Sequence, residues 1–301
     1  MAASDPKTGS FFDLSGRTKL RLTGADRIRF LNGQITNDLR KANKESAIQA
    51  CVLSVKGKMN AQIFLSAHED HILIDTDGSL EQALAARLER YIISDDVQIE
   101  NVTEQFSLFH FLGAKKPPLS GSYISVTRFG LTGQDLWVPA SQHDVTMQMA
   151  SSALPFCDQT CEEIWRIEQG IPAWGRELTE DTIPVEANLE QSSIDYSKGC
   201  YIGQEVISRM KMSGQRNKGL YGLVSRDNTP LSTEMKLYSS DDMTRQAGWI
   251  TSTTWSDRLG KNIALGFVKR PFNIPGAQLQ AALNDKTVTV EIVNLPFTIQ
   301  S

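Results

Sequence analysis

The segment DYSKGCYIGQEVISRM, residues 195–210, holds the side chains best suited to chemistry in this chain. Its cysteine, Cys200, lies between two glycines that give the backbone unusual freedom and let a ligand approach closely. Lys198 is a positive neighbour that favours the thiolate, the form that attacks electrophiles or binds metals. Gln204 adds an amide close by. The segment is therefore the first candidate for a functional site.

Four roles are open to Cys200: nucleophile, metal ligand, redox switch, or small buried hydrophobe. The residues alone leave a functional thiol and a structural cysteine in a glycine-rich turn equally compatible with the pattern. An iron–sulfur cluster usually takes four protein ligands, and the other three cysteines lack the usual spacing. If Cys200 binds a cluster, a partner protein must supply the other ligands.

The other cysteines and the histidines give weaker signals. Cys157 and Cys161 are four apart near a predicted helix without histidines nearby, so we expect them to pack as unpaired cysteines. His68 and His71 flank a turn that is expected to be exposed. We therefore expect no metal site. GxGxxG, Walker A, GxSxG and HExxH motifs do not occur, so the common nucleotide and hydrolase functions have no support.

A carboxylate, Glu168, ends a predicted helical segment just before Gly170 in the stretch RIEQGIP. Such a carboxylate either faces solvent or is partly buried. A partly buried carboxylate is a natural partner for a pterin or guanine edge, whose adjacent N–H donors match its two oxygens. Glu168 is therefore a second candidate for ligand binding.

A basic run without acidic residues, SRMKMSGQRNK, follows the cysteine segment. A run of this kind is often only a solvated face. Together with two lysines of an earlier turn, it is also compatible with a groove for a polyanion such as a folate tail or RNA. The cations concerned are Arg209, Lys211, Arg216, Lys218, Lys56 and Lys58.

Composition limits the class of protein. The 301 residues exceed what one compact core usually holds, so two or three structural units are expected. A formal charge of −4 argues against a protein whose whole surface binds nucleic acid or anionic lipid. Four scattered cysteines, no apolar leader and no membrane-spanning run predict a cytoplasmic, soluble protein without a disulfide framework.

The predicted strands and helices follow one another in a mixed order that is not typical of a doubly wound parallel sheet. Two apolar runs, 47–55 and 60–67, flank the turn KGK and predict a β-hairpin, with residues 71–77 as a third strand. SLEQALAARLERYI predicts a helix capped by Ser79. The mixed order favours the α+β class. From Gly214 onward, short strand candidates separated by turn residues predict a small β-barrel.

These residues resemble a known family. KGCYIGQE, residues 198–205, matches the hallmark of the YgfZ family, folate-binding relatives of the glycine-cleavage T-protein. Four other segments agree in order: FLNGQITNDL, VLSVKGKMNAQIFL, RIEQGIP with EDTIPVEANL, and AGWITSTTWSDRLGKNIALGFVKR. The resemblance implies a T-protein-like fold. Two interlocked α+β subdomains would form a folate-binding region over residues 1–214, and a C-terminal β-barrel would follow over residues 215–301.

The resemblance also implies a ligand and a role. The ligand is tetrahydrofolate or a derivative, with Glu168 on the pterin, and with Arg209, Lys198 and Gln204 also assigned to the folate site. Cys200 is the functional thiol. The family supports the assembly or repair of iron–sulfur enzymes, including tRNA-modifying ones. Iron–sulfur assembly proteins or client enzymes are the implied partners, with direct tRNA binding as a further expectation.

One departure bears on the reaction. T-proteins carry an aspartate that interacts with the reacting folate nitrogen, and this position falls on Ala61, while YgfZ-type sequences often keep an aspartate at the position of Gln62. Neither residue can steady a developing positive charge. Aminomethyl transfer by the glycine-cleavage route is thereby disfavoured. The alternative function is a folate-dependent one-carbon (aminomethyl) transferase or demethylase.

Overall fold

The computed structural model describes residues 9–113 and 117–298, which form two compact units. The two-sheet unit comprises Ser4–Asp158 and Leu189–Arg209. The barrel unit includes Gln159–Asn188 and Met210–Ser301. Each unit is described by itself. The predicted division between residues 214 and 215 stays a prediction.

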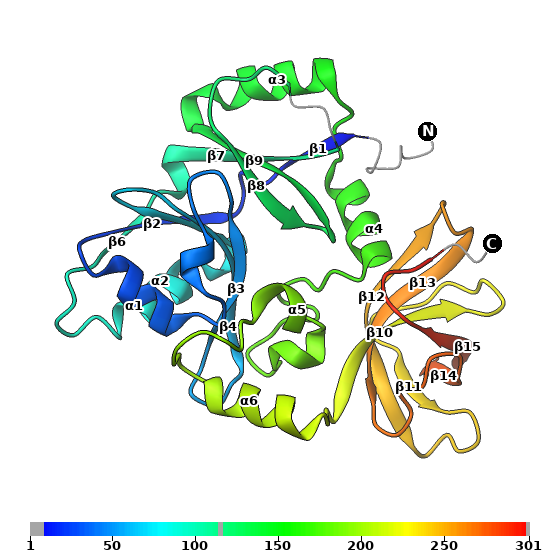
Figure 1. Cartoon of the computed structure of the whole chain (residues 1–301). Helices are drawn as coiled ribbons and strands as arrows, with labels where there is room; N and C mark the ends of the chain where they lie inside the picture. The colour runs from blue at the N-terminus through cyan, green and yellow to red at the C-terminus, as the bar shows by residue number, and fades with distance from the viewer. Residues whose placement is uncertain (1–8, 114–116, 299–301) are drawn as a thin grey trace. The chain divides into compact units, whose positions relative to one another are not determined.

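The first sheet of the two-sheet unit has four antiparallel strands in the order β1-β7-β9-β8 (Figure 1). Their bounds are β1 (Ser10–Asp13), β7 (Phe106–Leu112), β8 (Tyr123–Arg128) and β9 (Leu131–Pro139). Helix α3 (His143–Ala153) covers one face, where Ala150 packs into a cluster with Phe109 and Phe111. Along β8, buried residues alternate with more exposed ones because successive side chains point to opposite faces of a sheet.

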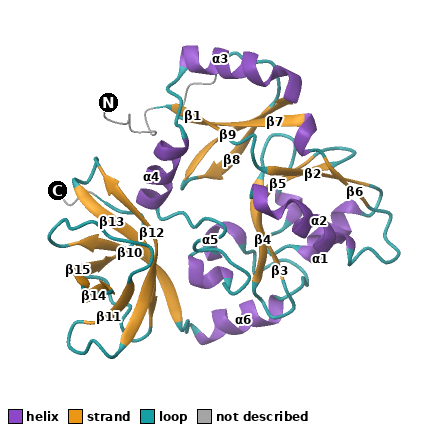
Figure 2. Ribbon diagram, turned by 180° about the vertical axis from the view of Figure 1, so that it is seen from behind, coloured by secondary structure: helices purple, strands orange, loops and turns teal. Residues whose placement is uncertain are grey.

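The second sheet has five antiparallel strands in the order β3-β4-β5-β2-β6 (Figure 2). Their bounds are β2 (Thr18–Thr23), β3 (Ile48–Leu53), β4 (Met59–Ala67), β5 (Ile72–Thr76) and β6 (Gln98–Asn101). Helices α1 (Arg27–Gln34) and α2 (Glu81–Glu89) lie beside this sheet. The predicted hairpin and third strand are confirmed as β3, β4 and β5.

The barrel unit contains a closed barrel of strands in the order β10-β13-β12-β11-β14-β15. Their bounds are β10 (Lys218–Ser225), β11 (Lys236–Ser239), β12 (Gln246–Ser256), β13 (Lys261–Lys269), β14 (Gln278–Leu283) and β15 (Lys286–Val293). Leu223, Val268 and Val290 belong to its buried interior. Helix α4 (Gln159–Gln169) belongs to the same unit. The predicted α+β class with a C-terminal β-barrel is confirmed.

The remaining helices are short or join these parts. They are α5 (Glu190–Ser193), α6 (Gln204–Ser213), and the 3₁₀ helices η2 (Leu39–Lys41), η3 (Gly78–Leu80), η4 (Thr103–Gln105), η5 (Ala140–Gln142) and η6 (Pro184–Ala187). None of the helices within the described part of the chain is both long and apolar enough to cross a bilayer.

Two local predictions are wrong. Ser79 does not cap α2, because Asp77 accepts a hydrogen bond from the Ser79 amide and starts a 3₁₀ turn instead, so α2 begins only at Glu81. Cys157 and Cys161 are disulfide-bonded rather than unpaired. Sequence spacing shows that residues four apart can meet, but it does not show whether two thiols are oxidised.

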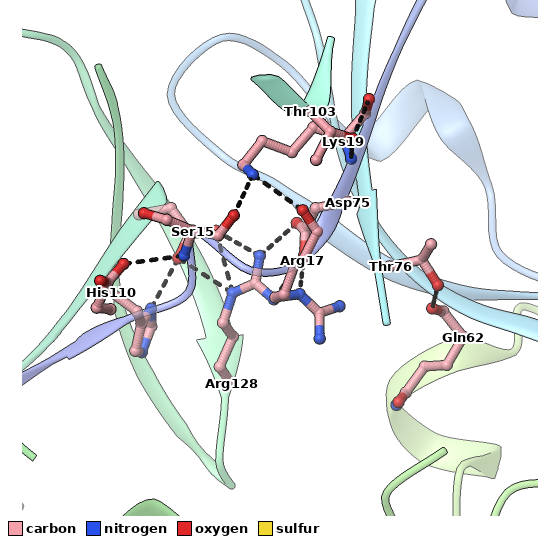
Figure 3. Close-up of polar contacts among 11 residues, drawn as sticks. Ser15, Arg17, Lys19, Gln62, Asp75, Thr76, Thr103, His110 and Arg128 are labelled. Atoms are coloured by element: carbon pink, nitrogen blue, oxygen red, sulfur yellow. Dashed lines mark hydrogen bonds and ion pairs between the residues drawn. The ribbon is translucent and has the colours of Figure 1, made fainter. Parts of the chain in front are cut away.

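A buried ion network joins the two sheets (Figure 3). Arg128, at the end of β8, donates to Asp75 of β5 over 2.5 Å and to Asp135 of β9 over 2.7 Å. Burial opposes the charge on Arg128, but the two carboxylates raise its pKa above the ordinary value. Nearby, the ammonium of Lys19 donates to the carbonyl oxygens of Ser15 and Arg17 over 2.6 and 2.9 Å. Arg128 is therefore a buried cation that binds one carboxylate from each sheet, while Lys19 binds neutral carbonyl groups beside it.

We expect Arg128→Gln to lower the free energy of unfolding by about 3–5 kcal/mol, because it removes the buried cation that Asp75 and Asp135 share and leaves Asp75 to Arg17 and Asp135 to His110. Arg29→Gln, the same change at an exposed pair with Asp95, should cost no more than about 1 kcal/mol. Chemical denaturation of the full chain measures both. Equal losses for the two variants would contradict the central role of Arg128.

Candidate functional site

Lys198 fastens the cysteine segment to the end of α1. Its ammonium donates to the carbonyl oxygens of Asn32 and Ile35, over 2.6 Å each, and the residue is only 5% exposed. Burial lowers the pKa of Lys198 to about 8, against the opposing effect of Asp38 and Asp195. These carbonyl groups remain without partners inside α1, so the lysine satisfies them as a capping cation does. The Lys198 amine thus fixes the cysteine segment to the C-terminal end of α1.

Backbone contacts also fix Ile202 and Gly203, which follow the cysteine. The Ile202 amide donates to the Gly33 carbonyl oxygen over 3.2 Å. Gly203 has a φ of +85°, and a Cβ there would lie 2.7 Å from the carbonyl oxygen of Ser54 in the β3–β4 turn. Only glycine allows this backbone approach without strain. Helix α6 begins at the next residue, Gln204.

Thr36 joins the preceding residues to the same sheet. Its hydroxyl donates to the Ser193 carbonyl oxygen over 2.5 Å and accepts from the Cys51 amide over 2.8 Å. Its own carbonyl oxygen accepts from the Asp195 amide over 3.0 Å. Because Cys51 is fully buried, its thiol has a pKa raised to about 12 and is not reactive at neutral pH.

Cys200 itself is a free, exposed thiol on this fixed segment. The other candidates of the segment differ in burial. Gln204 is half-buried at the start of α6, whereas the Arg209 side chain is 70% exposed and pairs with exposed Glu205 one turn earlier. Lys198, Cys200, Gln204 and Arg209 therefore lie on one loop and helix, with the thiol exposed and the lysine buried.

Glu168 lies in the barrel unit, near the end of α4, and is 3% exposed. One carboxylate oxygen accepts from the Ser256 hydroxyl, and the other accepts from Arg258 Nε over 2.7 Å. The backbone carbonyl oxygen of Glu168 accepts from the Phe297 amide over 2.9 Å. The carboxylate is thus buried and paired rather than facing solvent.

A second buried carboxylate, Glu177, was missed by sequence reasoning. It is fully buried, and it accepts from the Ser252 hydroxyl over 2.6 Å and from the Ala173 amide over 3.0 Å. Arg166 Nη1 lies 3.3 Å from it. Two buried serines lie four residues apart on β12: Ser252 donates to Glu177, and Ser256 donates to Glu168. The sequence offered no clear signal, because Ser252 is one of several serines and threonines in β12.

The turn side of β4 carries no carboxylate. Ala61 is fully buried, so its Cβ faces the core, whereas Gln62 is half-buried on the opposite face of the strand. The hydroxyl of Thr76 donates to the backbone carbonyl oxygen of Gln62 over 2.8 Å (Figure 3). The side-chain amides of Asn60 and Gln62 are therefore the polar groups that this part of β4 presents, and Asn60 accepts a hydrogen bond from Arg87 Nε over 3.3 Å.

Two cations of the basic run have partners within the barrel unit. Arg216 donates to the Val185 carbonyl oxygen and to Asn188, and Lys218 lies 3.5 Å from Glu186. For metals, the described ranges contain no group of three or more His, Cys, Asp or Glu side chains suited to an ion.

Known proteins resemble this chain over nearly its whole length. Residues 218–298 match the family model described as the glycine cleavage T-protein C-terminal barrel domain. An aminomethyltransferase of Desulforamulus reducens is 23% identical and aligns with 95% of this chain and 85% of its own. An aminomethyltransferase of Aquifex aeolicus is 31% identical, over 57% of this chain and 47% of its own.

A solved structure shows the same fold. The glycine cleavage system aminomethyltransferase T of Bartonella henselae superposes with a TM-score of 0.83, at 16% identity, covering 97% of this chain and 87% of its own. The chain is thus T-protein-like, and the predicted T-protein-like fold is confirmed.

We expect Gly203→Ala to destabilise the protein by about 2 kcal/mol or more, because alanine at this φ is strained and its Cβ meets the Ser54 carbonyl. Gly199→Ala is the matched control, since a Cβ there meets nothing within 4 Å. Urea unfolding measures the difference. Equal stability of the two variants would show that the close backbone approach is not needed.

The lowered pKa of Lys198 predicts a pH dependence. Between about 8 and the ordinary value of 10.5, the unfolded chain holds more protons than the folded chain. The stability contributed by Lys198 therefore rises with pH across this range. Unfolding of the wild type and of Lys198→Met from pH 7 to 10.5 should give a difference that grows in favour of the wild type. A pH-independent difference would contradict the buried ammonium.

Proposed function

We propose that this T-protein-like chain binds tetrahydrofolate or a derivative and supports the assembly or repair of iron–sulfur enzymes, as the YgfZ family does. The observation that carries the proposal is the exposed Cys200 thiol, which lies on a segment that Lys198 fixes to the end of α1. A reactive group held on a rigid support is the usual design of a functional site. The lysine is then a positioning residue rather than a folate contact.

Glu168 fits the pterin of a folate. Each of its oxygens accepts one hydrogen bond from the protein, and each keeps a second lone pair. Its partner Arg258 is 23% exposed and donates an N–H group of the kind that a pterin edge also offers. A ligand edge can therefore exchange with Arg258 at little loss of hydrogen bonding. Arg209 belongs to the two-sheet unit, and its assignment to the folate site remains an expectation from the resemblance.

The ligand supplies a carrier for one-carbon units, and the protein supplies the thiol. Cys200 offers a single thiolate, whereas a cluster usually takes four protein ligands. A client enzyme or an assembly protein would have to provide the others. The cluster is thus cargo, and Cys200 acts as a transient ligand, a nucleophile or a redox thiol toward it.

The second candidate is a folate-dependent one-carbon transferase or demethylase. It is favoured by the relatives that bear the name aminomethyltransferase and align with most of this chain. Against it stands β4, where Ala61 and Gln62 offer no carboxylate to steady a cationic intermediate. Both candidate functions use the same fold and a bound folate. They differ in the group that reacts, which is the Cys200 thiol in the accessory function and a carboxylate beside the folate in the transferase.

We expect Glu168→Gln to weaken tetrahydrofolate binding at least tenfold, because a neutral amide loses the charge-assisted hydrogen bonds to the ligand's N–H groups. Glu205→Gln removes an exposed carboxylate and should leave the affinity unchanged. Calorimetric titration of the full-length variants gives both dissociation constants. Equal affinity of Glu168→Gln and wild type would refute the assignment of Glu168.

An aminomethyl-transfer assay separates the two candidates. Purified protein given tetrahydrofolate and an aminomethyl donor should form no methylene-tetrahydrofolate, since β4 carries no acid. A T-protein serves as the positive control. Multiple turnovers by this chain would establish the transferase in place of the accessory function.

A further inference from the structure

The outer face of the barrel holds an open pocket of about 470 Å³. It lies where β10 begins and β13 ends, within the barrel unit. The lining residues are Asn217, Lys218, Trp249, Lys269, Arg270 and Pro271. This volume is in the range of small-molecule sites. Glu168, Cys200 and Arg209 do not belong to its lining, whereas Lys218 is one of the cations of the basic run.

Two lysines of the pocket are placed against each other. Lys218 of β10 and Lys269 of β13 are directly opposite in the strand register. Like charges in a cross-strand pair destabilise a sheet, and both lysines are half-buried. Glu186 lies 3.5 Å from Lys218, and Arg270 donates to the neutral amide of Gln215. The lining thus has three cations and no acidic residue, in a chain of net charge −4.

Two aromatic rings, of Trp249 and Phe267, lie next to Lys218. The Lys218 ammonium lies 5.2 Å from the ring centre of Trp249 and 4.9 Å from that of Phe267. Trp249 is half-buried and lines the pocket. An indole offers a surface on which a planar ring can stack, and lysines offer charge to an anionic group. A ligand that uses both must carry a planar ring and an anion close together.

We propose that this pocket binds a nucleotide unit, with its base against Trp249 and its phosphate between Lys218 and Lys269. A phosphate relieves the repulsion between the two lysines, whereas a neutral ring alone does not. A carboxylate tail would pair with the lysines but leave the exposed part of the half-buried indole uncovered. The nucleotide unit comes either as a free nucleotide or as one residue of a single-stranded nucleic acid. The proposal is independent of folate binding.

Calorimetric titration of the full chain tests the site with three probes: inorganic phosphate, uridine monophosphate, and a 5′-phosphorylated oligouridylate. We expect the nucleotide and oligonucleotide to bind with an affinity that falls as salt rises. Tighter binding of the oligonucleotide identifies a nucleic acid as the source, and equal or tighter binding of the monophosphate identifies a free nucleotide. Failure of both to bind overturns the proposal.

Substitutions locate the binding. Lys269→Glu should weaken both nucleotide probes at least tenfold, while Lys261→Glu, the same change at the other end of β13, should leave them unchanged. Trp249→Leu should weaken the nucleotide but not inorganic phosphate, which has no ring to stack. Equal effects of the two lysine variants contradict the site. Displacement of the nucleotide by tetrahydrofolate also contradicts it, because the pocket would then be part of a folate site.

Discussion

The ion network around Arg128 is the constraint on which the two-sheet unit depends. The two sheets share no strand, and the Arg128 guanidinium binds a carboxylate from each. Backbone hydrogen bonds between residues 45–47 and Ser125 add a second junction beside it. A buried guanidinium is stable only while it is fully paired, so the network permits one arrangement of the sheets. The five-stranded sheet in turn supports the cysteine segment.

The barrel unit also contains buried carboxylates that lie close to arginines. Glu168 and Glu177 are buried carboxylates, and each accepts from a serine hydroxyl of β12 and lies close to an arginine. The two differ in access to solvent. Arg258, the partner of Glu168, is partly exposed, whereas Arg166, the partner of Glu177, is 5% exposed. This difference suits Glu168 to a ligand and Glu177 to holding the segment in place.

Local sequence signals predicted much of the fold. The two apolar runs around KGK predicted the β3–β4 hairpin because apolar runs joined by a short glycine turn are a property of a few adjacent residues. The turn residues after Gly214 similarly predicted the barrel. The start of α2 was misplaced, since Asp77 competes with Ser79 for the cap and the choice depends on the local backbone.

The site was less accessible to sequence reasoning. Lys198 was predicted as a positive neighbour of Cys200, but its ammonium binds carbonyl groups more than 160 positions earlier in the chain, which no local pattern shows. Likewise, Glu177 meets Ser252 through the fold, and no spacing rule links such distant residues. The lysine pair of the barrel pocket arises from strand register, which a single strand does not specify.

The central claim is that Cys200, held by its fixed segment, performs the protein's function in iron–sulfur maintenance. Its most direct test is complementation of a strain that lacks the gene, with the activity of a [4Fe–4S] enzyme and glycine-cleavage flux measured in parallel. The account predicts that the wild-type gene restores the cluster enzyme, that Cys200→Ser does not, and that glycine cleavage is unaffected throughout. Full restoration by Cys200→Ser would contradict it.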